Sequence, residues 1–163
     1  MQKSERISAF VQTLESSRGG RYHPCYAGFF ECFNKGEYYE AHDVLEHLWL
    51  ECRDADRSFY QGLIQIAGAF VHLKKQRRRP CHPTDGRRLR PGFRLFLLAE
   101  KNLTPFAPIH LGLDVEAVLA MCSEWRGLIE REGFQINPWS PDSGPVLLPE
   151  GLFRSGESQD FAG

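Results

Sequence analysis

The sequence predicts an all-α protein, folded as one compact bundle of about five helices that pair as antiparallel hairpins. Apolar residues recur at the three- and four-residue spacing of a helix in several segments of the chain. Turn and capping residues separate those segments, as in "RDAD" at residues 53–56. A chain of 163 residues has the usual length of a single domain, so one hydrophobic core is expected.

The chain divides into three parts in this prediction. Residues 1–23 hold a weakly amphipathic stretch followed by "SSRGGRYHP", which predicts an N-terminal arm or a short helix. Residues 24–134 are expected to form the helical domain. Residues 135–163 contain four prolines and no sustained apolar period, so an extended or disordered tail is expected, with Trp139 docked on the core.

The first three helices of the domain follow from local signals. Pro24 suits the first turn of a helix that ends near Gly36. The second helix is expected over about residues 37–52, and "RDAD" forms the turn after it. Asp56 is expected to cap the third helix, about residues 57–76. Apolar residues surround much of that helix, which predicts its burial on more than one side.

The second half of the domain is less regular. Residues 77–92, "RRRPCHPTDGRRLRPG", contain three prolines and two glycines, which predicts an irregular Arg/Pro-rich crossover. A fourth helix follows and ends near Leu103, with its start on either side of Pro91. After a loop, Asp114 is expected to cap a last helix that ends at Gly133.

Composition excludes several classes of protein. Hydrophobic residues make up 42% and charged residues 25% of the chain, which is typical of a globular protein and not of a disordered one. No run reaches the length of a membrane span, and the first residues lack the apolar stretch of a secretory signal. Five cysteines without a C-x-x-C pair predict neither a disulfide framework nor a zinc ribbon. We therefore expect a cytoplasmic protein with no membrane partner; the oligomeric state stays open, and a homo-oligomer is one outcome.

Basic residues are concentrated in one segment. Between Lys74 and Arg94 nine basic residues stand against one acid, a net charge of +8, and the remainder of the chain carries −9. Segregated charge of this kind indicates an acidic partner or nucleic acid at the crossover, and a solvated crossover without a partner is the alternative. Nucleic acid is the weaker interpretation, because the crossover lacks aromatic residues for base stacking. The residues expected to bind such a partner are Arg77, Arg78, Arg79, Arg87 and Arg88.

Polar side chains follow one face of the second helix and one of the third. His42 and Glu46, four residues apart, share a helix face with Trp49 and Tyr39. A polar line on the third helix consists of Gln61, Gln65, Gly68 and His72. In an antiparallel hairpin, residues whose numbers sum to about 110 face one another, so the two polar faces are expected to meet.

Three interpretations of this arrangement remain open. His42, Glu46 and the glutamines can form a closed hydrogen-bond network, because a buried polar group must be hydrogen-bonded. Alternatively, His42 and Glu46 can bind one divalent metal ion, with His72 or a glutamine oxygen and water completing its shell. In the third interpretation, His42 is a general base that Glu46 orients, in a cleft edged by Tyr39 and Trp49.

Three segments together resemble domain-of-unknown-function family number 309 of bacteria and archaea: "FNKGEYYEAHDVLEHLW", "DRSFYQGLIQIAGAFVHL" and "LTPFAPIHLGLDVEAVLAMC". The resemblance covers about residues 27–132, and its hallmark pattern H-x-x-x-E-x-x-W is matched by His42, Glu46 and Trp49. It implies a compact helical bundle and, without an established reaction, metal binding by His42 and Glu46. After His72 the chain departs from the family's pattern, because the link here is longer, arginine-rich and broken by prolines.

The function predicted first is a divalent-metal or small-ligand site at His42 and Glu46, with the identity of the metal ion left open. The second hypothesis is a binding or adaptor module that uses the segment from Arg77 to Arg94 on an acidic partner. The third is a metal-assisted hydrolase, which needs an open coordination position and room for a substrate.

Overall fold

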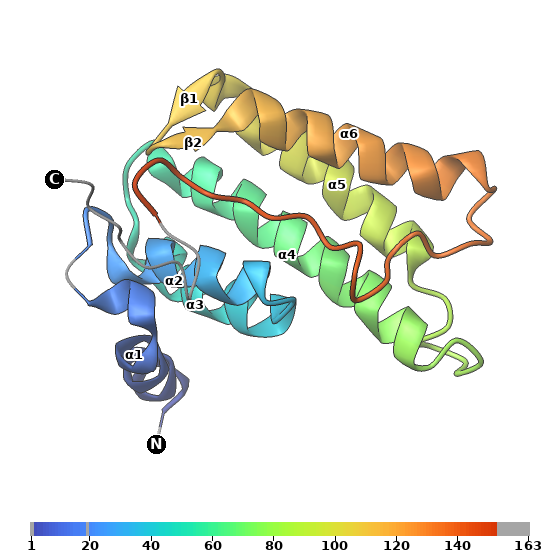
Figure 1. Ribbon diagram of the computed structural model, residues 1–163, viewed down its shortest axis with the longest axis horizontal. Helices are drawn as coiled ribbons and strands as arrows, with labels where there is room; N and C mark the ends of the chain where they lie inside the picture. The colour runs from blue at the N-terminus through green and yellow to red at the C-terminus, as the bar shows by residue number, and fades with distance from the viewer. Residues whose placement is uncertain (1, 19, 153–163) are drawn as a thin grey trace, which may run out of the picture.

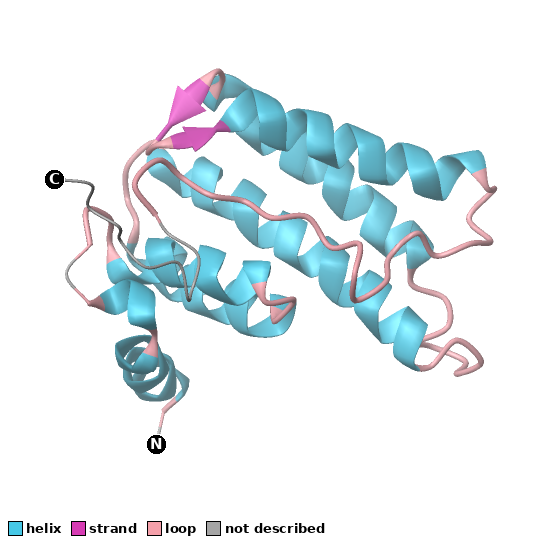
Figure 2. Cartoon of the chain, in the orientation of Figure 1, coloured by secondary structure: helices cyan, strands magenta, loops and turns pink. Residues whose placement is uncertain are grey.

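Helices make up most of the computed structural model, which describes residues 2–18 and 20–152 (Figure 2). The α-helices of this part of the chain are α1 (Lys3–Thr13), α2 (Pro24–Asn34), α3 (Tyr38–Glu51), α4 (Asp56–Arg78), α5 (Leu89–Leu103) and α6 (Val115–Arg131). The remaining elements are the 3-10 turns η1 (Glu15–Ser17) and η2 (Thr104–Phe106) and an antiparallel pair of strands, β1 (Ile109–His110) and β2 (Leu113–Asp114). The predicted all-α bundle is confirmed.

The longest helix, α4, lies in the middle of the bundle. It packs against α3 on one side and α5 on the other, with α2 against α3 and α6 against α5 (Figure 1). Helix α1 is peripheral and contacts α2 and α3. Buried apolar residues surround α4 as predicted, among them Phe59, Leu63, Ile66 and Phe70, and they meet a row of aromatic side chains from α2. Within the described residues, no helix combines the length and the apolarity that a membrane span requires.

Local residues explain the starts of α2 and α6. Pro24 begins α2, and the Asp114 carboxylate accepts the backbone N–H of Ala117 at 2.9 Å to cap α6. The predicted cap of α4 is wrong by two residues. Asp56 is already helical, and the carboxylate of Asp54 accepts its N–H at 2.8 Å.

Two regions are more ordered than the sequence predicts. Helix α5 starts at Leu89, before Pro91, because the missing N–H of proline costs nothing in a first turn. The loop after α5 contains the β1–β2 hairpin, whose turn uses Leu111 and Gly112 with positive φ angles of 44° and 72°. Strands of two residues have no periodic pattern, so the sequence gives no sign of them.

Residues 135–152, here called the C-terminal strap, run back along α4 from the end of α6 to the β1–β2 hairpin (Figure 1). The strap is extended and is fixed to the bundle by side chains. Trp139 is only 5% exposed, and its Nε1 donates to the hydroxyl of Tyr38 at 3.1 Å. The side-chain amide of Asn34 bonds both the N–H and the carbonyl of Leu147, at 2.8 and 2.9 Å. Residues 153–163 of the predicted tail lie outside the described residues.

Candidate functional site

The His42 face of α3 lies at the surface, where α1 crosses it. His42 Nε2 is 3.6 Å from Glu46 Oε2, and His42 Nδ1 is 3.2 Å from Asp43 Oδ1. Lys3 of α1 places its Nζ 3.3 Å from Glu46 Oε1 and 3.5 Å from Asp43 Oδ1. The side chains of His42 and Glu46 are 32% and 28% exposed, so these four residues form a half-exposed charge cluster.

Lys3 is the cation of this cluster and contacts both of its carboxylates. The carboxylates of Asp43 and Glu46 raise the pKa of Lys3, so its ammonium stays charged. Across residues 2–18 and 20–152, no three His, Cys, Asp or Glu side chains are grouped in a way that could hold a metal ion. The two atoms that could share a cation here are His42 Nε2 and Glu46 Oε2, and Lys3 contacts the other oxygen of Glu46, Oε1.

The polar line of α4 faces α5, and the predicted meeting with the His42 face is wrong. Gln65 Oε1 accepts a hydrogen bond from Asn102 Nδ2 of α5 at 2.8 Å. His72 Nδ1 accepts one from Arg88, just before α5, at 3.2 Å. Burial and the nearby charges of Arg88 and Lys75 lower the pKa of His72 to about 4. Gln61 is half-buried on the same helix.

The apolar residues that α3 buries explain why the polar line of α4 faces α5. Helix α3 turns Ala41 and Leu45 into the core, so α4 must offer apolar residues to it, and its polar side chains rotate toward the partners on α5. The structure therefore brings His42 and Glu46 together and places His72 elsewhere. The predicted closed network with the glutamines does not form between α3 and α4, because Gln65 bonds α5.

Tyr39 and Trp49, predicted to edge one cleft beside His42, have different surroundings. Tyr39 is 59% exposed, and its ring lies nearly parallel to that of His42 with the ring centres 6.5 Å apart. Trp49 instead lies under Arg57, whose guanidinium is 4.2 Å from the ring centre and donates to the carbonyl of Trp49 at 3.1 Å. Trp49 therefore helps to join the end of α3 to the start of α4.

The predicted arginine cluster divides into two groups. In the crossover between α4 and α5, Asp85 pairs with two of its members: its carboxylate is 3.3 Å from Arg79 Nη1 and 2.5 Å from Arg88 Nη2. The hydrogen bond from Arg88 lowers the pKa of Asp85. Arg87 is exposed to solvent. Arg79 and Arg88 therefore stabilise the crossover itself, whereas Arg77 and Arg78 lie in the last turn of α4.

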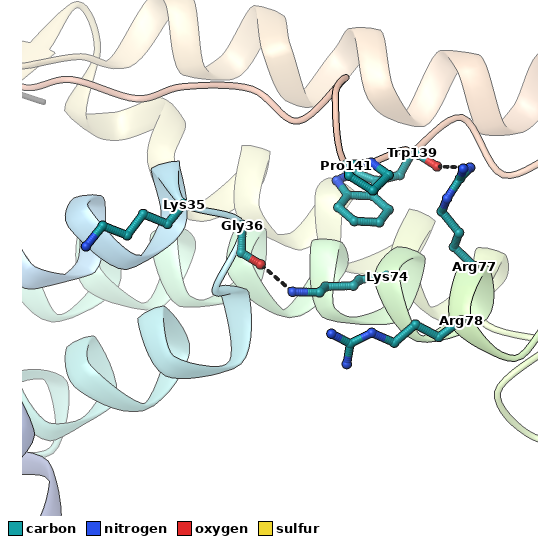
Figure 3. Close-up of a pocket in the computed structure, with 7 residues that line it drawn as sticks. All are labelled: Lys35, Gly36, Lys74, Arg77, Arg78, Trp139 and Pro141. Carbon is teal, nitrogen blue, oxygen red and sulfur yellow. Dashed lines mark hydrogen bonds between the residues drawn. The ribbon is translucent and has the colours of Figure 1, made fainter. Parts of the chain in front are cut away.

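A pocket of about 460 Å³ opens where the last turns of α4 meet the end of α2 and the C-terminal strap (Figure 3). Four of its lining residues are cationic and none is acidic. The complete lining is Lys35, Gly36, Lys74, Arg77, Arg78, Trp139 and Pro141. We refer to it as the basic pocket.

Backbone carbonyls hold two of these cations in place. Lys74 Nζ donates to the carbonyl of Gly36 at 2.8 Å, and Arg77 Nη1 donates to that of Trp139 at 3.4 Å (Figure 3). Neither they nor the two other cations of the basic pocket form an ion pair with any described carboxylate. The Lys35 ammonium extends away from Trp139, so Lys35 lies at the rim of the pocket (Figure 3). The pocket thus holds positive charge that the described part of the protein does not neutralise.

Sequence analysis identified two of the pocket residues, Arg77 and Arg78, and missed the others. Lys35 and Trp139 come from segments far from α4 in the chain, and only the path of the strap brings Trp139 to it. The available signals were the run of basic residues that ends α4 and a tryptophan within a proline-rich segment.

Comparison with known families gives one match. A family model described as Domain of unknown function (DUF309) matches residues 26–82. The matched segment contains His42, Glu46 and Trp49 as well as the α4 part of the basic pocket, and it ends before the strap. Searches of curated proteins and of solved structures gave no match.

Proposed function

We propose that this protein, whose residues 26–82 match the family model of the domain of unknown function DUF309, has a binding function in which the basic pocket holds an anionic group of a partner molecule. The observation that supports it is the lining of the pocket, which carries four cationic side chains and no acidic one. Such a function requires no chemical reaction.

Electrostatics favours an anion at this position. Four cations line this pocket with no acidic residue among them, and an anion bound there would make charge-assisted hydrogen bonds with them. Basic residues in a last helical turn also interact favourably with the helix dipole, which accounts for part of the charge on α4. Lys35, the C-cap residue of α2, has the same favourable position at the end of its own helix, so the dipoles account for part of the charge on both elements. In the crossover, by contrast, Asp85 pairs with Arg79 and Arg88, and Arg87 is exposed.

Two double variants test this function with equal changes in net charge. Lys35→Glu/Arg78→Glu reverses two pocket cations that have no ion pair among the described residues. Arg87→Glu/Arg94→Glu reverses two exposed cations outside the pocket. Retention of each protein on a polyanion such as heparin is measured against salt concentration. We expect the pocket variant to lose about tenfold in affinity and the control to lose about twofold. Equal losses, or no retention of the unsubstituted protein at low salt, would contradict the proposal.

A second candidate function rests on the 3.6 Å approach of His42 Nε2 to Glu46 Oε2. We propose that this pair binds a divalent cation, with water completing the coordination shell. Metal content is measured in protein purified without a histidine tag and compared with His42→Ala and Glu46→Ala. Lys3→Ala is the informative third variant, because it removes the ammonium that competes for Glu46 and should strengthen binding. Absence of metal in all forms, with no thermal shift on adding zinc, manganese or nickel, would exclude this candidate and any metal-assisted hydrolysis with it.

A further inference from the structure

The basic pocket also indicates the chemical class of its ligand. Resting on the anion-binding function proposed above, we infer that the pocket takes a small organic phosphate that carries at least two negative charges. Three features lead to this inference: the size of the pocket, the number of its cations and the apolar wall on one side.

Size and surroundings favour a small molecule over a polymer. A volume of about 460 Å³ falls within the range of small-ligand pockets. A nucleic acid or a long acidic peptide binds along a row of cations, and such a row would continue from Arg78 into the crossover. There the next arginine, Arg79, is paired with Asp85, as is Arg88. Four cations without an ion pair among the described residues therefore share one cavity, whereas Arg87 and Arg94 are exposed and lie outside its lining.

The cations suit a phosphate better than a single carboxylate. A phosphate monoester carries about 1.5 to 2 negative charges at neutral pH and has three strong acceptor oxygens. Lys74 and Arg77 each use one N–H on a backbone carbonyl, so the remaining N–H groups of each are available to a ligand. Arg78 adds a guanidinium fork, which matches phosphate oxygens in geometry. One carboxylate would leave most of this charge unpaired.

The strap supplies the reason for an organic group on the phosphate. Trp139 and Pro141 form the side of the pocket opposite the cations of α4 (Figure 3). The indole N–H is already engaged by Tyr38, so Trp139 presents carbon atoms to a ligand. Trp139 is only 5% exposed, so the apolar surface that the sugar or ring of an organic phosphate would cover, and an inorganic anion would not, consists of the accessible edge of this indole and the exposed ring of Pro141.

Calorimetric titration at low salt tests the inference with three ligands: ADP, inorganic pyrophosphate and adenosine. ADP and pyrophosphate carry similar charge, so the difference between their affinities measures the contribution of the apolar wall. The affinity of adenosine measures the contribution of the organic part alone. We expect ADP to bind about tenfold more tightly than pyrophosphate and adenosine not to bind. Lys35→Glu/Arg78→Glu should abolish ADP binding, and Arg87→Glu/Arg94→Glu should retain it. Equal affinities for ADP and pyrophosphate would overturn the organic-phosphate assignment.

The outcomes separate this inference from the function on which it rests. Pocket-dependent retention on heparin without any binding of ADP would overturn the small-ligand inference and leave the anion-binding function standing. Loss of both would overturn both. Tryptophan fluorescence adds a positional check, because Trp139→Phe keeps an aromatic ring in the wall. This variant should still bind ADP but lose the fluorescence change, and a change that persists would place the ligand elsewhere.

Discussion

The ionisable side chains along α4 differ in what surrounds them. His72 is half-buried, accepts a hydrogen bond from Arg88 and is held neutral at physiological pH by its lowered pKa of about 4. Two residues further on, the Lys74 ammonium donates to the carbonyl of Gly36 and lies 5.9 Å from the ring centre of Tyr38, with no ion pair among the described residues. One helix therefore carries a structural histidine and a cation that is available for binding.

His72 makes the stability of the protein depend on pH. The unfolded chain binds a proton at His72 below about pH 6.5, whereas the folded chain does so only below about pH 4. Folding is therefore weakened as the pH falls from about 6.5 to 4, and this contribution is absent above pH 7. We expect a loss of roughly 2 kcal/mol, because a tenfold difference in proton affinity is worth about 1.4 kcal/mol and His72 is only half-buried.

Denaturant titrations of the unsubstituted protein and His72→Asn, at several values between pH 4 and 7, measure this effect. Asparagine keeps an acceptor near the position of Nδ1 and cannot ionise. The difference in unfolding free energy between the two proteins should shift in favour of His72→Asn at acid pH. A difference that does not change with pH would contradict the assignment.

Local spacing allowed the approach of His42 to Glu46 to be predicted, because residues four apart on a helix are always neighbours. The partner of His72 could not be predicted in the same way. The sequence of a helix that is buried on two sides does not fix its rotation about its own axis. The apolar residues of α3 and the polar partners on α5 determine which face of α4 packs against which neighbour.

The contact between α4 and α5 depends on a glycine. A Cβ atom on Gly62 would lie 2.7 Å from Cγ and 2.9 Å from Cδ2 of Leu103. These distances are shorter than van der Waals contact, so the two helices approach as closely as they do because Gly62 has no side chain. A glycine inside a helix otherwise destabilises it relative to alanine.

Gly62→Ala should therefore destabilise the protein by about 1–3 kcal/mol through overpacking against Leu103. Gly127→Ala in α6 is the matched control, since its Cβ would have no neighbour within 4 Å. That control should stabilise by about 0.5–1 kcal/mol through helix propensity. Thermal or denaturant unfolding measures both, and equal effects of the same sign would be inconsistent with this account.

The C-terminal strap is fixed by hydrogen bonds from side chains instead of regular secondary structure. Asn34→Ala removes both bonds to Leu147 and leaves that peptide without its partners. We expect a loss of about 1–2 kcal/mol in stability and faster proteolysis within residues 141–152. Asn102→Ala removes a comparable bond between α5 and Gln65 without touching the strap. It should lower stability without increasing cleavage of the strap, and equal cleavage of both variants would refute this role for Asn34.

Helix ends were predictable because capping is local, as at Pro24 and Asp114. The path of the strap was not, because an extended proline-rich segment has no apolar period that assigns it to a face of the bundle. Burial of Trp139 was expected from its side chain alone. Its position beside Arg77 follows only from the folded chain.

The charge of the molecule as a whole is nearly balanced but unevenly placed. In the crossover, Asp85 pairs with Arg79 and Arg88 and leaves Arg87 exposed, and the four cations of the basic pocket have no ion pair among the described residues. Three separate segments build that pocket, from the end of α2, the end of α4 and the strap. The basic run of α4 could be recognised in the sequence. That the end of α2 and the strap lie beside it could be seen only in the folded structure.

An anion that binds only the folded protein should raise its stability by mass action. At about 10 mM pyrophosphate we expect a higher unfolding midpoint than in sodium chloride of equal ionic strength. Lys35→Glu/Arg78→Glu should lose the increase, and Arg87→Glu/Arg94→Glu should keep it. An equal increase in both variants would show that the pocket is not responsible.

The most direct measurement of where an anion binds is a ¹H–¹⁵N NMR titration of the labelled protein with ADP at low salt. We predict saturable shifts of the Trp139 indole signal and of the backbone amides of Gly36 and residues 74–78, with the indoles of Trp49 and Trp125 unchanged. Shifts centred on the crossover residues 79–88 or on His42 and Glu46, or no shifts at all, would contradict binding in the basic pocket.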